Sequence, residues 1–387
     1  MSKIMVKEKN STLNDFQIFC LRLSGIWPHD PNAIWFRIAW TLLLSLMLSN
    51  EFYYAYIHFN INKLPEFMET LATIMCFLIG LIKLIIIWCN DWKVKRIVNM
   101  IIEDWNECVS RNLEWIYNIM NKNAIFCERC TKSIIVFFVL SVTVFGCCCY
   151  IFGSKDYQLI LTMVFPFDIN NQLNYKIVLV AQYIYLATCA ATWFGNITTF
   201  MLTLILHIGG QIDVISQTLK NMSNFSEDSE FVRFEIKSLI GKHQRIISMS
   251  NDIEATFTYI ILVQFLCSSL IICCIGFVIA VGLRTNQELG MLLKMGSYYF
   301  PTTFEAFIYC YIGEYLSNKS NAISYMAYEY EWYNLKTSEC RLLMVLIMRS
   351  QKPLQLTVGK FMNLTLQQFT SIMKLSISYI SLLLAVY

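Results

Sequence analysis

Several apolar stretches of the sequence carry hydroxyl, aromatic and small side chains at helical spacing. Thr143, Gly146 and Tyr150 follow an i, i+3, i+7 spacing, which places them on one helix face. Further candidates in three other apolar stretches are Leu71, Tyr183 with Leu186, and Met295 with Tyr298. Apolar walls with a few hydroxyls are typical of a pocket for a small apolar molecule. Ordinary helix packing has the same composition, so the residues alone leave both interpretations open.

A second pattern lies in the last apolar stretch, where hydroxyl-bearing residues alternate with apolar ones. Ser378, Ser381 and Ala385 stand at i, i+3, i+7. Small residues at this spacing favour close helix packing. They are equally typical of a pore wall that ends in a hydrophobic constriction, and the pattern does not choose between the two.

Residue constellations of enzymes are missing from the sequence. None of the four histidines belongs to a metal-binding pair, and neither a nucleophile elbow nor a phosphate-binding loop is present. Cys127 and Cys130 form a lone CxxC motif without a second pair, so a zinc or redox site is not expected. The net charge of +3 and the lack of a basic, aromatic-rich patch argue against nucleic-acid binding. We therefore expect no enzyme, no metal and no cofactor.

The elements that position these residues follow from the distribution of apolar residues. The chain of 387 residues is 56% hydrophobic and 15% charged, whereas soluble domains carry about 25% charged residues. About 20 apolar residues are needed to cross a hydrocarbon core of about 30 Å. Seven stretches meet this length: 34–58, 65–89, 131–153, 177–208, 257–283, 290–313 and 361–386. The prediction is an all-α, polytopic membrane protein with seven transmembrane helices.

Lysine and arginine alternate along the chain in a way that predicts its orientation. The segments 1–33, 90–130, 209–256 and 314–360 together contain 21 of these residues, and the connections between them contain only a handful. The positive-inside rule then predicts a cytoplasmic N-terminus and, with seven spans, an extracellular C-terminus. Some N-x-S/T sequons lie on the basic side and would favour the reverse orientation, but such tripeptides are common by chance.

The basic segments contain apolar stripes at helical spacing. In 209–256 the stripe consists of Ile212, Ile215, Leu219, Met222, Ile236, Leu239, Ile240, Ile246 and Ile247, and in 338–350 of Leu342, Leu343, Val345, Leu346 and Ile347. Such faces must be buried against another surface. Packing within the chain and a subunit interface in the cytoplasm are both compatible with them.

Five ionisable residues fall inside the predicted spans, where an unpaired charge is costly. Glu69, Lys83 and Lys294 lie near span ends, and snorkelling toward the polar region explains them. Glu305 and Lys374 lie deeper. We expect these two to pair with each other, or one of them to face a hydrated path.

Aromatic and polar motifs run through the last 80 or so residues. They read Tyr309-Cys310-Tyr311-Ile312-Gly313, Tyr328-Glu329-Tyr330-Glu331-Trp332-Tyr333-Asn334-Leu335, Met348-Arg349-Ser350-Gln351-Lys352-Pro353, Leu356-Thr357-Val358-Gly359-Lys360-Phe361 and Ser378-Tyr379-Ile380. In this combination they resemble insect odorant receptors, in the form common among hymenopterans. The N-terminal half is similar more loosely, at Leu81-Ile82-Lys83 and Glu103-Asp104-Trp105.

The resemblance implies a ligand-gated, non-selective cation channel, a tetramer in which the seventh helix of each subunit lines one central pore. It implies a tuning subunit that assembles with the shared co-receptor, Orco, because 209–256 is too short for the co-receptor's own insertion. A small volatile apolar ligand would bind in the outer half of spans 2, 3, 4 and 6, at the candidate residues given above. The protein would lie among membrane lipids in the plasma membrane, in sensory-neuron dendrites.

The resemblance also assigns the pore residues. The gate of the family lies three residues after the motif tyrosine, which corresponds to Leu382, and the narrow segment continues to Ala385 and Val386, with Ser378 on the same helix. Ile380 departs from the Phe or Leu that is common at its position. A gustatory-type receptor channel is the first alternative, although the Gln-Phe ending frequent in that family is missing. A non-channel receptor or transporter with seven spans is the second.

These expectations divide the chain into four parts. They are a cytoplasmic N-terminal segment (1–33), spans one to six with the odorant pocket in their outer half (34–313), cytoplasmic anchor helices (314–360) and the pore-lining seventh span (361–387).

Overall fold

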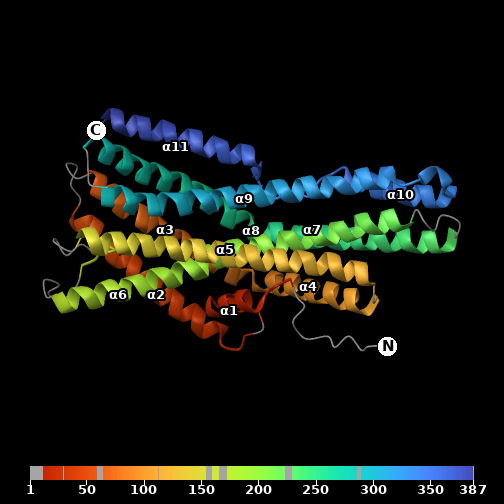
Figure 1. Cartoon of the computed structure of the whole chain (residues 1–387), viewed down its shortest axis with the longest axis horizontal. Helices are drawn as coiled ribbons and strands as arrows, with labels where there is room; N and C mark the ends of the chain where they lie inside the picture. Colours follow the sequence, from red (N-terminus) through yellow and green to blue (C-terminus); the bar gives the residue numbers. More distant parts are fainter. Residues whose placement is uncertain are drawn as a thin grey trace.

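The structure is a computed structural model that describes residues 12–28, 30–58, 64–111, 113–153, 159–164, 172–222, 229–285 and 289–386. Long helices lie side by side along the longest axis of the molecule (Figure 1). Their bounds are α1 Asp15–Leu23, α2 Ala33–Ile57, α3 Leu64–Cys89, α4 Asp91–Arg111, α5 Glu114–Gly153, α6 Gln172–Cys189, α7 Ile197–Met222, α8 Ser229–Arg284, α9 Leu289–Glu329, α10 Thr337–Ser350 and α11 Leu366–Val386. A π-helix, η2, occupies Ala190–Asn196, and a 3₁₀ turn, η4, occupies Trp332–Asn334.

Six helical stretches of the described chain have the length and the apolar composition to cross a membrane. They are Ala33–Ile57, Leu64–Cys89, Glu114–Phe152, Gln172–Met222, Glu230–Arg284 and Leu366–Ala385. The predicted span 290–313 is also helical, within α9, but it is less apolar because tyrosines and two charged residues interrupt it. The all-α fold with several membrane-spanning helices is confirmed.

Three helices are much longer than a membrane crossing requires. Helix α5 has 40 residues, α8 has 56 and α9 has 41. At 1.5 Å per residue, α8 extends over about 84 Å, nearly three times the thickness of a hydrocarbon core. The predicted spans 131–153 and 257–283 are therefore the apolar parts of longer helices, whose polar parts continue toward the end of the bundle that carries α10 (Figure 1).

The two apolar stripes of the basic segments are buried to different extents. Nearly all of the stripe in 209–256 is buried within the chain, including Ile212, Ile215 and Ile236. In α10 only Leu343 and Leu346 of the predicted stripe are buried, and Val345 is 56% exposed. Packing within the chain therefore explains the first stripe, whereas α10 keeps an exposed apolar face.

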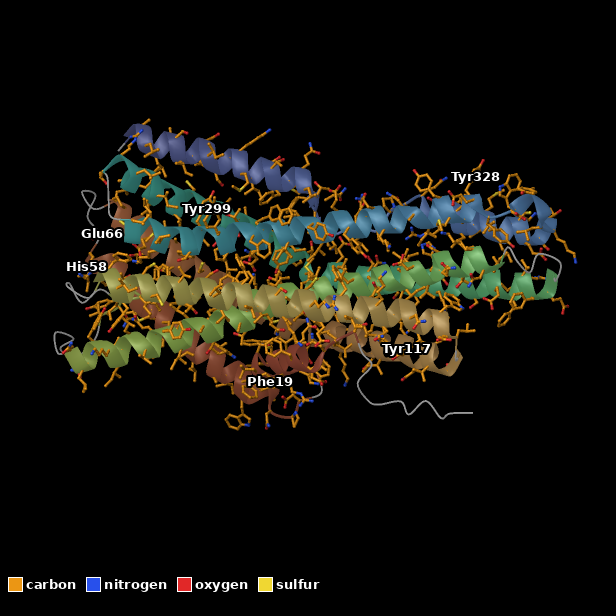
Figure 2. All side chains as sticks on the ribbon, viewed as in Figure 1. Phe19, His58, Glu66, Tyr117, Tyr299 and Tyr328 are labelled. Atoms are coloured by element: carbon orange, nitrogen blue, oxygen red, sulfur yellow. The ribbon has the colours of Figure 1, made fainter. Side chains whose placement is uncertain are left out.

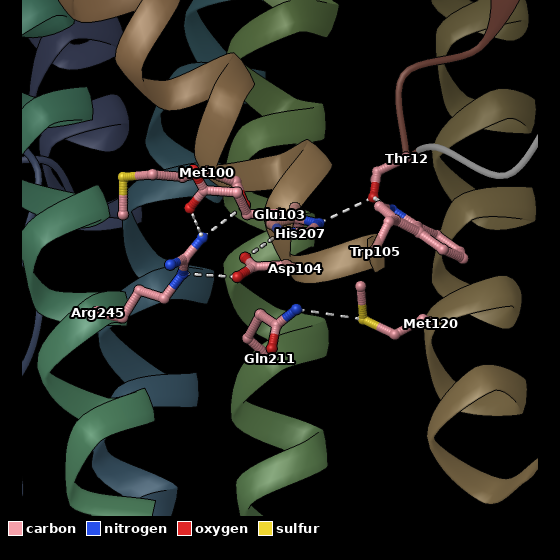
Figure 3. A network of polar contacts seen from close by, with 9 residues as sticks. All are labelled: Thr12, Met100, Glu103, Asp104, Trp105, Met120, His207, Gln211 and Arg245. Carbon is pink, nitrogen blue, oxygen red and sulfur yellow. Dashed lines mark hydrogen bonds and ion pairs between the residues drawn. The ribbon is translucent and has the colours of Figure 1, made fainter. Parts of the chain in front are cut away.

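A polar network joins four parts of the chain (Figure 3). The Nε2 atom of His207 on α7 lies 3.0 Å from Asp104 Oδ2 on α4, and its Nδ1 lies 2.8 Å from Thr12 Oγ1. Arg245 on α8 reaches Asp104 Oδ1 at 2.7 Å, and the indole N–H of Trp105 donates to Thr12 Oγ1 at 2.9 Å. Because an ionised carboxylate only accepts, His207 Nε2 is the donor in its contact with Asp104.

A short β-hairpin precedes α11. Strand β1, Thr357–Val358, pairs antiparallel with β2, Met362–Asn363. Gly359 and Lys360 at the turn have φ of 57° and 66°, a left-handed conformation that glycine adopts without steric cost. The N–H of Gly359 donates to the carbonyl of Thr258 on α8 at 3.1 Å. The helix that was predicted from residue 361 therefore begins at Leu366, and the Gly-Lys pair supplies the turn before it.

Large apolar side chains also cover the outer surface of the bundle (Figure 2). On α2, Trp35, Leu42 and Leu46 are each more than 60% exposed. Phe19 on α1 and Tyr328 near the end of α9 project outward as well (Figure 2). An apolar surface of this kind along α2 is expected where a helix faces lipid rather than water.

Candidate ligand-binding cavity and pore helix

A largely apolar cavity of about 120 Å³ lies between α3, α5, η2 and α9. Its wall consists of Thr73, Cys76, Phe77, Phe138, Ser141, Val142, Phe145, Leu161, Leu186, Cys189, Ala190, Trp193, Phe194, Ser297, Tyr298, Pro301, Thr302 and Glu305. An apolar cavity of about 150 Å³ inside a protein can stay dry and bind benzene. The size and lining therefore suit a compact aromatic or aliphatic molecule.

Two departures from regular α-helix geometry shape this wall. The π-helix η2 contributes Ala190, Trp193 and Phe194, and π-helical segments are frequent at functional sites because they shift the register of the side chains. On α9, Pro301 has no N–H to donate toward the carbonyl one turn earlier. Both irregular segments face the cavity.

The cavity contains part of the predicted ligand-binding set. Leu186 and Tyr298 line it, whereas the other six predicted residues do not. On each of the four helices the lining residues lie about one turn further from the end of the bundle at which α5 ends and α6 begins. The cavity and the predicted residues thus share the same helices but lie at different depths along them, and the predicted ligand-binding set stays a prediction.

Two of the predicted residues on α5, Thr143 and Gly146, pack against Tyr183 of α6. The hydroxyls of Thr143 and Tyr183 lie 3.0 Å apart, and the face of Gly146 lies against the Tyr183 ring, which leaves little room for a larger side chain. Thr143 and Gly146 therefore join α5 to α6 beside the cavity, whereas Tyr150 is 49% exposed.

Met295 and Leu71 belong to a neighbouring apolar cluster between α3, α8 and α9. Met295 is buried there against Ala72 and Ile271, and Leu71 packs at its edge. Tyr298 connects this cluster to the cavity, because its hydroxyl donates to the carbonyl of Ala72 at 2.8 Å.

Glu305 of the cavity wall belongs to a buried ion pair that was not predicted from the sequence. Glu305 Oε1 lies 2.7 Å from Lys83 Nζ and accepts from the hydroxyl of Thr198 at 3.0 Å, while Gln264 donates to Oε2 at 2.9 Å. The partner expected for Glu305, Lys374, is instead exposed on α11. The expected snorkelling of Lys83 is also wrong, because its side chain is 1% exposed.

A second ion pair lies toward the ends of α3 and α9. Lys294 Nζ is 2.6 Å from Glu69 Oε1, and the two side chains are 16% and 19% exposed. The prediction was that each residue snorkels separately, whereas the structure pairs them. Pairing removes most of the cost of placing both charges near apolar surroundings.

Helix α11 lies at the edge of the bundle, packed on α8 and α9 (Figure 1). Only 6% of its apolar window is buried. The predicted gate residue Leu382 is 62% exposed, and Ser378 and Ala385 are exposed too. Val386 is the last residue of the helix, and its side chain lies outside the described set. Most of the α11 surface is thus without a partner within one chain.

Within the described part of the chain, no cluster of three or more His, Cys, Asp or Glu side chains has the arrangement to hold a metal ion. All 15 cysteines are free thiols. Cys127 is buried, and Cys130 is half-buried beside it on α5. The site therefore consists of an apolar cavity, a buried ion pair and an exposed terminal helix.

Comparison with known proteins identifies the family. The family model described as 7tm Odorant receptor matches residues 63–377. Odorant receptor 13a of Drosophila melanogaster is 24% identical, with 96% of each chain covered, and odorant receptor 85c of the same species is 22% identical, with 94% of this chain and 92% of the relative covered.

Solved structures share the fold. The insect olfactory receptor OR5 from Machilis hrabei, in complex with eugenol, superposes with a TM-score of 0.81 at 14% identity, over 96% of this chain and 97% of that one. A second structure of the same receptor superposes with a TM-score of 0.77 at 15% identity. The matched family is one of receptors, not of enzymes, and the chain belongs to the insect odorant receptor family.

Proposed function

We propose that this chain is the tuning subunit of an odorant-gated, non-selective cation channel that assembles with the Orco co-receptor as a heterotetramer. The cavity between α3, α5, η2 and α9 carries the proposal, because a largely apolar space of about 120 Å³ suits a small volatile molecule. The channel function rests on α11, whose apolar surface is left almost entirely uncovered by its own chain.

The topology proposed for the chain has seven spans, with the N-terminus in the cytoplasm and the C-terminus outside. The 21 lysines and arginines of the basic segments support it, with 290–313 as the sixth span. In this arrangement 1–33 and the anchor helices of 314–360 are cytoplasmic, 34–313 holds the first six spans and 361–387 lines the pore. The proposed location is the plasma membrane of a sensory-neuron dendrite.

The affinity available to the cavity is modest. A ligand of about ten heavy atoms, at roughly −0.3 to −1.5 kcal/mol for each atom, reaches about −8 kcal/mol, which corresponds to a micromolar dissociation constant. Selectivity among such ligands comes mainly from shape, since one methylene group changes binding by about 1–3 kcal/mol. Binding opens the channel only where the ligand favours the open state over the closed one.

A route from the cavity to the pore helix runs along α9. Tyr298, Thr302 and Glu305 line the cavity. Two residues beyond Glu305, Phe307 packs edge-on against Phe369 of α11, with 5.6 Å between ring centroids. Further along α9, the missing side chain of Gly313 lets the Leu364 backbone approach closely. A shift of α9 on ligand binding would therefore move the base of α11 and widen the ring at Leu382.

Assembly with the co-receptor is supported by exposed apolar residues at the far end of α9 and on α10. They are Tyr325, Tyr328, Met344, Val345 and Met348, each more than half exposed. Contiguous exposed apolar surface outside the membrane marks a protein interface more often than a free surface. We assign it to contacts with neighbouring subunits.

Whole-cell current tests the proposal. The chain, the co-receptor and both together are expressed in cells that are then exposed to a broad odorant panel. The proposal predicts odorant-evoked cation current that requires this chain and depends on the co-receptor. Ligand-evoked current from this chain alone would favour a gustatory-type channel, and uptake or G-protein signalling without current would favour a non-channel receptor or transporter.

A further inference from the structure

Each hydroxyl group of the described cavity wall already donates a hydrogen bond within the protein. Thr73, Ser141, Ser297 and Thr302 each donate to a carbonyl three or four residues earlier on their own helix, at 2.7–3.1 Å. The hydroxyl of Tyr298 donates to the carbonyl of Ala72 or to the Cys76 sulfur, both at 2.8 Å. A ligand therefore meets oxygen lone pairs at these positions and no free O–H.

Trp193 differs from these hydroxyls. Its side chain is 1% exposed and lines the cavity, and its Nε1 has no hydrogen-bond partner among the described residues. A buried donor without a partner costs free energy that a matching acceptor would recover. Such a group in a native protein calls for an explanation, and a ligand is one.

The packing of the indole indicates which edge is available. The Cε3–Cζ3 edge of Trp193 sits directly on Gly80 of α3, so closely that even a Cβ at residue 80 would overlap it. Nε1 lies on the opposite edge of the ring, which is turned away from Gly80. Cys189, four residues earlier and also in the cavity wall, brings only a thiol near the indole, and a thiol sulfur is a weak acceptor that does not replace a ligand oxygen.

We propose that the indole N–H of Trp193 is the hydrogen-bond donor that holds an acceptor oxygen of the ligand, so that compact ketones, aldehydes and ethers bind better than hydrocarbons of the same shape. This inference rests on the proposed function, because it takes the cavity as the odorant site. The five hydroxyls of the described wall already donate hydrogen bonds within the protein. Among its N–H and O–H groups, the indole N–H of Trp193 is therefore the donor available to a neutral ligand. Phe77 and Phe194, with ring centroids 5.9 and 6.0 Å from Trp193, supply apolar contact around that oxygen.

The experiment compares ligand pairs of matched shape in cells that express the chain with its co-receptor. Acetophenone and isopropylbenzene, with roughly nine heavy atoms each, form one pair, and further pairs replace a carbonyl by a methylidene or methyl group. The measured quantity is the ratio of half-maximal concentrations within a pair. A change in expression or folding alters both members equally and leaves this ratio unchanged.

The inference predicts that the ketone acts at a roughly tenfold lower concentration than its hydrocarbon partner. Trp193→Phe, which removes the N–H and keeps an aromatic ring, should bring the ratio close to one. Trp40→Phe is the matched control, because the Trp40 ring lies 6.0 Å from Trp193 but donates to the carbonyl of Leu23. That variant should keep the wild-type ratio.

Three results would overturn the inference. They are equal potency within the pairs in the wild type, a ratio that survives Trp193→Phe, and silence toward both members of every pair while a co-receptor agonist still evokes current. None of these would by itself contradict the proposed function. That proposal fails where the wider odorant panel evokes no current that depends on both this chain and the co-receptor.

Discussion

Lys83 Nζ and Glu305 Oε1 lie 2.7 Å apart, and both side chains are 1% exposed. The pair joins α3 to α9, and Gln264 and Thr198 add bonds from α8 and α7. Removal of one member leaves a buried charge without its partner, whereas removal of both leaves an apolar contact. A single substitution in this pair should therefore destabilise the protein, whereas replacement of both residues by apolar ones should cost much less.

Lys83→Met should destabilise the folded protein by about 3–5 kcal/mol, because Glu305 loses its counter-charge. The double variant Lys83→Met with Glu305→Leu should recover most of that loss. The thermal unfolding temperature of purified protein measures both effects. Lys294→Met is the control, because its pair with Glu69 is more exposed and should cost less. A double variant no more stable than Lys83→Met would contradict this role of the pair.

Leu382→Ser should raise the current in the absence of odorant several-fold. A hydroxyl at a hydrophobic constriction favours hydration of the pore and so lowers the barrier to ions. Whole-cell current before odorant addition is the measurement. Ile377→Ser serves as the control, since Ile377 is similarly exposed at 59% but lies on a different face of α11. Unchanged basal and evoked currents in Leu382→Ser would show that the gate lies elsewhere.

Met344→Asp combined with Met348→Asp should weaken assembly with the co-receptor. The two side chains are 58% and 65% exposed on α10, and a charge placed in an apolar interface must lose its hydration. We expect a roughly tenfold drop in the amount of co-receptor that purifies with this chain. Ile102→Asp on α4, at 43% exposure, should leave that amount unchanged. Equal recovery of the co-receptor with both variants would rule out α10 as the contact.

His243 on α8 predicts a pH dependence of stability. Burial, with a smaller contribution from the charge of Arg349, lowers the pKa of His243 to about 4, whereas an unfolded histidine titrates near 6.5. Between about pH 6.5 and about pH 4 the unfolded chain thus binds more protons than the folded one. The contribution of His243 is complete above about pH 6.5 and is lost as the pH falls through this window.

Thermal unfolding at about pH 7.5 and about pH 5 tests this prediction. The loss of unfolding temperature on acidification should be smaller in His243→Gln than in the wild type. His58→Gln, a change at an exposed histidine, should keep the wild-type loss. An equal loss of unfolding temperature on acidification in all three proteins would contradict the role assigned to His243.

The helices could be predicted from the sequence because long apolar runs and the 3.6-residue stripes reflect one-dimensional patterns. The partner of Lys83 could not, because Glu305 lies 222 residues away in the chain and only the packed bundle brings the two together. A lysine near the end of an apolar run has the same sequence context whether it forms an ion pair or snorkels to the polar region.

The depth of the cavity was beyond sequence reasoning for a different reason. The segment from Ala190 to Asn196 is a continuous helical run by composition, and its π-helical geometry depends on packing against neighbouring helices. That geometry determines which side chains face inward, including Trp193. Two local features of the sequence indicate this region: Pro301 within an apolar span, and the glycine at position 80, which leaves space for the indole.

The central claim is that odorant binds in this cavity and opens the channel, and the concentration dependence of odorant-evoked current in Ala190→Leu tests it most directly. Ala190 is 5% exposed in the cavity wall, so a leucine there fills much of the space. We predict at least a roughly tenfold increase in the half-maximal concentration, with co-receptor agonist current unchanged. Thr143→Val, which alters a contact with Tyr183 outside the cavity, should change the half-maximal concentration little. An unchanged concentration dependence in Ala190→Leu would contradict the account.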